Sequence, residues 1–74
     1  MEQFINFFKE YLELEIDVQP KDKFRDYSEW DSLAALSVTA IAHDKYNVNI
    51  MAEDLRSCTT VADIYDLILQ KTKR

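Results

Sequence analysis

Ser32 and His43 are the residues of this sequence that could form a catalytic pair. Ser32 follows Asp31, and His43, the only histidine, comes eleven residues later in the same apolar-periodic stretch. On one helix this separation is about 16 Å along the axis, which is beyond hydrogen-bond reach. The chain also has no glycine, which the sharp turn that exposes the serine of many hydrolases requires. The sequence therefore predicts a protein that is not an enzyme.

Cysteine and histidine usage argues against a disulfide or a metal centre. Cys58 is the only cysteine, so it has no intrachain partner, and one cysteine with one histidine makes no zinc-ligand set. The start at Met1 lacks the basic and apolar runs of a secretion signal, and no stretch reaches the ~18 apolar residues of a membrane span. We expect a cytoplasmic protein without a bound metal, in which Cys58 is buried and unreactive.

The negative charge is concentrated in the middle of the chain. The net charge is −5, and residues 26–55 alone contain six acidic residues against one basic residue. Nucleic-acid binding requires a basic face, so this class of function is excluded. An acidic surface favours protein partners with basic docking surfaces. The alternative is that these acids form a solvated surface without a partner.

The elements that must position Ser32 have the pattern of helices. The chain has 74 residues, 47% of them hydrophobic, with no glycine and one proline, which predicts one domain over 1–74 with few tight turns. Apolar residues recur with helical spacing over 3–15, 32–46 and 61–71, a short helix is expected at 52–55, and a long loop at 16–30. We expect an all-α four-helix bundle with three longer helices and one short helix. We also expect the protein to be a monomer.

The first helix and the long loop are expected to supply core residues. An aromatic stripe on the first helix is far more typical of a core than of a ligand site, and it comprises Phe4, Phe7, Phe8 and Tyr11. The loop has no helical period but contains apolar residues that should attach it to the core, namely Ile16, Val18, Phe24 and Trp30.

The helix over 32–46 is apolar on two sides. Asp31 and Ser32 supply capping chemistry at its start. The side predicted to face the core contains Ala35, Val38, Thr39, Ala42 and Tyr46. A helix in so small a protein cannot be buried all round, so the opposite side, with Leu33, Leu36 and Ala40, is expected to contact a partner. The alternative is that the loop or the first helix covers Leu33 and Leu36.

Three segments together resemble the acyl carrier protein family. Trp30-Asp31-Ser32-Leu33 is similar to the family's D-S-L motif, at which phosphopantetheine is attached. The run from Tyr46 to Leu55 resembles the family's short third-helix segment, and Thr59 to Ile64 resembles the T-T-V-x-D opening of its last helix. In the last segment Thr60 and Asp63 also have the spacing of a capping box. The resemblance therefore spans the chain.

The resemblance implies a cofactor, a site and partners. A phosphopantetheinyl transferase would attach 4'-phosphopantetheine, covalently and from coenzyme A, to Ser32, with Asp31 and Leu33 completing the motif and Asp31 helping the transferase engage its metal and substrate. Further partners would be acyl or aryl ligases, synthases and transferases with basic docking surfaces. The residues expected to contact these partners are Leu36, Ala40, Asp44, Glu53 and Asp54. Those expected to line an acyl chain are Val38, Ala42, Tyr46, Ile50, Leu55, Cys58, Val61, Ile64 and Ile68.

The sequence departs from the family pattern at several positions, and it leaves open which pathway and which class of cargo the protein serves. The second helix has Asp44 as its only acid after Asp31, and Glu29 stands where the family often has glycine. These changes favour a specialised partner set. We expect a carrier of acyl thioesters in fatty-acid, polyketide or related specialised biosynthesis. The alternatives are an aminoacyl, peptidyl or aryl carrier of a nonribosomal-type pathway, and a helical interaction adaptor in which Ser32 stays unmodified.

Overall fold

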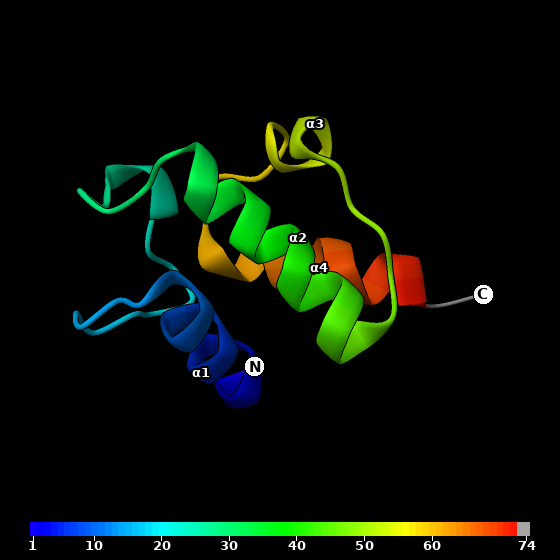
Figure 1. The fold of residues 1–74 in the computed structure, drawn as a ribbon, viewed down its shortest axis with the longest axis horizontal. Coiled ribbons are helices and arrows are strands. Elements are labelled where there is room, and N and C mark those ends of the chain that lie inside the picture. The colour runs from blue at the N-terminus through cyan, green and yellow to red at the C-terminus, as the bar shows by residue number, and fades with distance from the viewer. Residues whose placement is uncertain (73–74) are drawn as a thin grey trace.

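The computed structural model describes residues 1–72, which form four α-helices around one core (Figure 1). This confirms the predicted all-α fold with three longer helices and one short helix. The elements are α1 (Glu2–Leu12), a 3-10 turn η1 (Phe24–Asp26), α2 (Ser32–Tyr46), α3 (Ala52–Leu55) and α4 (Val61–Thr72). Helix α2 is central, because it contacts each of the other three helices. Within 1–72 no strand forms, and the only bridge of the β type pairs Lys23 with Thr60.

Aromatic residues fill the end of the bundle where α1 meets α2 and α4. Phe4 and Phe8 are fully buried, as predicted from the stripe, whereas Phe7 and Tyr11 are half-buried at its edge. The Phe4 ring lies 5.4 Å from that of Tyr65 and 6.3 Å from that of Tyr46, measured between ring centroids. Tilted contacts at these distances are favourable for aromatic pairs. They join the first helix to α2 and α4.

Helix α1 ends at Leu12, three residues before the predicted end. Glu13 adopts a left-handed conformation with φ 56° and ψ 42°, and the backbone N–H of the next residue, Leu14, donates to the Lys9 carbonyl at 2.9 Å. This geometry closes a helix and turns Leu14 into the core, where it is buried. Glycine usually occupies such a position. In its absence Glu13 ends α1, and Asn47, with φ 57°, ends α2.

The long loop is attached to the core as predicted, with one exception. Val18 and Phe24 are buried, and Trp30 is half-buried against the core. The expectation for Ile16 is wrong, because its side chain is exposed. Since α1 ends early, Leu14 and Val18 take the inward positions on either side of Ile16.

Helix α2 has the predicted bounds, but its buried face is turned from the predicted one. The buried residues are Ala34, Val38, Ile41 and Ala42, whereas Ala35 and Thr39 are half-buried. The reason is that α2 packs against α1, α3 and α4 together, and these contacts set its rotation. Leu33 and Leu36 are 69% and 63% exposed. They face outward as expected, and the alternative that the loop or α1 covers them is wrong.

Candidate functional site

Ser32 is the first residue of α2, and its side chain is exposed at the open end of that helix. The preceding residue, Asp31, has extended backbone angles and caps the helix, because its Oδ1 accepts the Ala34 N–H at 2.9 Å. The Asp31 carbonyl accepts the Ala35 N–H at 3.2 Å. The capping predicted from the sequence is therefore confirmed. It presents the Ser32 hydroxyl to solvent in the first turn of a helix.

An aromatic pair anchors the segment that precedes Ser32 in the chain. Phe24, in η1, is fully buried, and the Trp30 ring packs on it with 4.6 Å between centroids and an interplanar angle of 56°. The Trp30 N–H also donates to the Tyr27 carbonyl at 3.1 Å. Because Trp30 precedes Ser32 by two residues, this packing holds the chain at the start of α2 against the core.

Arg25 connects this anchored loop to the end of α3 and the turn after it. Its guanidinium donates to the Leu55 carbonyl at 2.6 Å and to the Cys58 carbonyl at 2.5 Å, and it lies over the Phe24 ring at 4.7 Å. Both carbonyls belong to the end of α3 and the turn that follows it. Sequence reasoning missed this role, since the only local signal was the position of Arg25 beside an apolar residue.

Arg25→Ala is expected to lower the free energy of unfolding by about 1–3 kcal/mol, because two carbonyls would lose a charged donor. Urea denaturation followed by circular dichroism measures this change. Lys23→Ala, at an exposed neighbouring position, is the matched control and should have little effect. Equal losses for both variants would show that the Arg25 contacts do not stabilise the fold.

Tyr27 provides a second attachment of the loop. Its hydroxyl donates to Asp22 Oδ2 at 2.9 Å. Burial of the ring and, after it, this hydrogen bond to a carboxylate raise the pKa of the Tyr27 phenol. The phenol therefore remains a protonated donor at neutral pH.

The residues predicted to contact partners differ in how accessible they are. Leu36, Asp44 and Glu53 are exposed, whereas Ala40 and Asp54 are half-buried. The Asp54 carboxylate accepts the Met51 N–H at 2.8 Å and lies 3.9 Å from Lys71 Nζ, so it caps α3. Sequence reasoning did not include Met51 in this surface, although it is 63% exposed.

The residues predicted to line an acyl chain belong to the common core. Eight of them are buried: Val38, Ala42, Ile50, Leu55, Cys58, Val61, Ile64 and Ile68. Tyr46 differs, because it is half-buried between the rings of Phe7 and Tyr65, at 6.3 and 6.4 Å. Burial raises the pKa of its phenol.

Cys58 is expected to react slowly with alkylating reagents in the native protein. Its side chain is 4% exposed, and burial raises the pKa of its thiol, which lowers the fraction of reactive thiolate. Reaction with iodoacetamide, followed by mass spectrometry, should be slow in buffer and fast in denaturant. Equal rates in the two conditions would contradict the packing of Cys58.

The first turn of α4 confirms the predicted capping box. Asp63 Oδ2 accepts the backbone N–H groups of Thr59 and Thr60, at 2.9 and 3.0 Å, and the Asp63 N–H donates to Thr60 Oγ1 at 3.2 Å. The two backbone hydrogen bonds, first that from Thr60, lower the pKa of the Asp63 carboxyl. Aspartate thus replaces the usual glutamate at this position of the box.

No helix of residues 1–72 is both long and apolar enough to cross a membrane. Over the same residues, no three or more histidine, cysteine or carboxylate side chains gather in a way that could hold a metal ion.

Comparison with known families identifies the kind of domain that this chain forms. The profile of the family described as "Phosphopantetheine attachment site" matches residues 2–68. The chain belongs to this family. Phosphopantetheine-attachment domains bear covalent 4'-phosphopantetheine, which a phosphopantetheinyl transferase installs, and they carry cargo for partner enzymes instead of acting as catalysts. The predictions of the family, the cofactor and a protein that is not an enzyme are thus confirmed.

Several curated relatives of this phosphopantetheine-attachment domain are named acyl carrier protein. That of Acidothermus cellulolyticus is 36% identical over 56 residues, which cover 76% of this chain and 67% of the relative. Those of Myxococcus xanthus and Micrococcus luteus are each 35% identical over 52 residues, covering 70% of this chain and 66% and 64% of the relatives. The matches thus span about two thirds of each relative. No solved structure gives a significant match.

Proposed function

We propose that Ser32 bears the phosphopantetheine arm and that the chain transports acyl intermediates as thioesters in fatty-acid, polyketide or related specialised biosynthesis. The observation that supports this most is the exposed Ser32 hydroxyl in the first turn of α2, within the segment that matches the family. The names of the relatives support acyl groups as the cargo.

The surroundings of Ser32 suit both the attachment reaction and its product. In that reaction Ser32 Oγ forms a bond to phosphorus, a P–O bond of the coenzyme A pyrophosphate breaks, the adenosine bisphosphate half leaves, and the hydroxyl proton passes to a base of the transferase. The product is a phosphodiester anion. A helix N-terminus favours an anion through its dipole and its free N–H groups, so α2 stabilises the modified state.

We propose that partner enzymes dock on an exposed face next to Ser32. This docking face comprises Leu33, Leu36 and Met51, with the exposed acids Glu29, Asp31 and Glu53 at its margin. The acids favour ligases, synthases and transferases with basic surfaces and mainly raise their association rate. The apolar residues provide the close contact. Asp54 is left out, because it is half-buried and its carboxylate lies 3.9 Å from Lys71 Nζ.

An apolar cargo would have to enter between the residues of the predicted lining, eight of which are buried in the described state. We further propose that the carrier is a monomer with a single domain and that it acts in the cytoplasm, where a buried, unpaired thiol such as Cys58 persists in reduced form.

Intact-mass measurement separates this function from that of an unmodified adaptor. The protein is incubated with coenzyme A and a broad-specificity phosphopantetheinyl transferase, and the mass should increase by one phosphopantetheine. The same protein without transferase is the control. A chain that folds but gains no mass would support the adaptor and contradict the carrier.

A further inference from the structure

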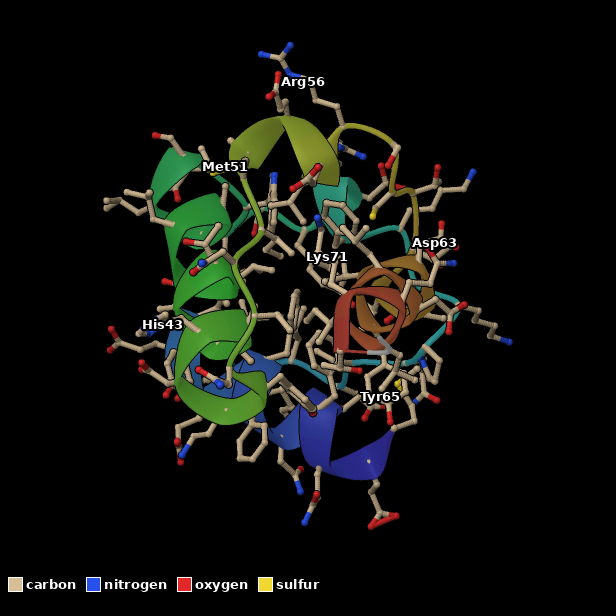
Figure 2. All side chains as sticks on the ribbon, turned by 90° about the vertical axis from the view of Figure 1, so that its right-hand side faces the viewer. His43, Met51, Arg56, Asp63, Tyr65 and Lys71 are labelled. Atoms are coloured by element: carbon tan, nitrogen blue, oxygen red, sulfur yellow. The ribbon has the colours of Figure 1, made fainter. Side chains whose placement is uncertain are left out.

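A surface hollow lies beside the second half of α2, at the segment that leads to α3. Its lining includes Thr39, His43 and Asp44 from α2, and Asn49, Ile50 and Met51 from the returning chain. Figure 2 shows His43 on α2 and Met51 next to the start of α3, the two helices that the returning segment joins. The cavity volume is about 520 Å³, which is within the range of small-molecule sites. The hollow shares Met51 with the docking face and Ile50 with the core lining, but its polar residues Thr39, His43 and Asn49 belong to neither.

The hollow is within reach of a group attached to Ser32. Residues at spacings of four, seven and eleven lie on one side of a helix, so Ser32, Leu36, Thr39 and His43 form one line along α2. From Ser32 to Thr39 and His43 this line measures about 10–16 Å. The backbone of phosphopantetheine has about as many bonds as four residues of extended chain, which is roughly 15 Å. The end of the arm therefore arrives at the hollow.

The chemistry of the hollow favours a positively charged group on an apolar stem. Ile50 is 4% exposed and forms the apolar floor of the hollow. Met51 is 63% exposed at its edge, where its flexible side chain can adapt to a ligand. The Thr39 hydroxyl donates to the Leu36 carbonyl at 2.6 Å, so its oxygen is left as an acceptor. Among the described residues of the lining, Asp44 is the one carboxylate, and none is lysine or arginine.

Contacts from two other residues position the Asp44 carboxylate. The Tyr11 hydroxyl of α1 donates to Asp44 Oδ2 at 3.1 Å, and His43 Nδ1 lies 3.4 Å from Oδ1. The Asp44 side chain is still 53% exposed, and a carboxylate has about four acceptor sites. The nearest cation in sequence, Lys45, lies over the Phe7 ring at 5.0 Å, which directs it towards α1. Asp44 can therefore accept a further donor.

We propose that this hollow is the resting site of the carried group, and that this group is a short acyl chain with an ammonium substituent. The ammonium would contact Asp44, and the carbon stem would lie on Ile50 and Met51. The inference rests on the proposed function, because it requires the arm at Ser32. A short chain is specified because a long one would have to enter the core, where Val38, Ile64 and Ile68 are fully buried.

The test compares three cargoes of similar length on the full chain. A broad-specificity transferase loads the arm together with its acyl group from β-alanyl-, butanoyl- or succinyl-coenzyme A, and intact mass verifies each product. Failure of all loading would contradict the proposed function, whereas the outcomes below concern the hollow alone. Amide ¹H–¹⁵N spectra of each loaded form are then compared with the form that bears the free arm.

The β-alanyl form should shift the amide signals of Thr39, His43, Asn49 and Met51, and the neutral butanoyl and anionic succinyl forms should leave them near their free-arm positions. Asp44→Asn should remove most of the β-alanyl shift. Asp66→Asn, which changes an exposed acid on α4, is the matched control and should retain it. The same spectra verify that both variants fold.

Three results would overturn the proposal. Equal shifts from β-alanyl and butanoyl groups would exclude recognition of the ammonium. Shifts concentrated at Val38, Ile64 and Ile68 would place the cargo inside the core. A β-alanyl spectrum identical to that of the free arm, or unchanged by Asp44→Asn, would exclude the hollow or its carboxylate as the resting site.

Discussion

Ser32→Ala should abolish the mass gain on incubation with coenzyme A and a phosphopantetheinyl transferase. The alanine side chain has no oxygen to bond to phosphorus, so the loss should be complete. The fold should persist, because Ser32 is exposed and the cap of α2 is provided by Asp31. Alanine is also the best helix former for this position. Intact mass spectrometry measures modification, and circular dichroism verifies the helices.

Other serines serve as matched controls for this experiment. The Ser57 hydroxyl donates to the Asp54 carbonyl at 2.9 Å, and that of Ser28 donates to Glu29 at 3.2 Å. Neither residue opens a longer helix, so Ser28→Ala and Ser57→Ala should be modified like the parent protein. Modification of Ser32→Ala, or loss of modification in either control, would show that the attachment residue is assigned wrongly.

Leu36→Asp should slow modification by the transferase about tenfold or more, because covering a leucine side chain contributes about 1.5–3 kcal/mol. The fold should be unchanged, since Leu36 is 63% exposed in the free protein. Initial rates at low carrier concentration give kcat/KM, the quantity in which a lost docking contact is expressed. Circular dichroism verifies that the variant has the helix content of the parent.

Asp44→Asn is the comparison for this variant, because it removes a charge from the same helix. Its effect on the modification rate should be smaller and should fade with added salt, since exposed charges mainly influence encounter and are screened. If Asp44→Asn slowed modification more than Leu36→Asp did, steering by charge would dominate recognition. The apolar docking face would then have to be abandoned.

The sequence by itself determined those helix bounds that depend on local capping residues. The bounds of α2 and α3 and the start of α4 agree with the prediction, because Asp31 and the Thr60–Asp63 box are local capping signals. The outward position of Leu33 and Leu36 was predicted from helical periodicity and the small size of the domain. The family followed from the D-S-L motif and the two segments after it, and the family match confirms it.

The tertiary structure alone decided the features that depend on residues far apart in the chain. Helix α1 ends early because Leu14 enters the core. The rotation of α2 is set by the helices that pack around it. Arg25 binds carbonyls about thirty residues away, and Tyr11 positions Asp44 from another helix. The surface hollow likewise exists only because the chain after α2 returns along that helix. Helical periodicity shows which residues share a side of one helix, whereas packing between elements determines what that side meets.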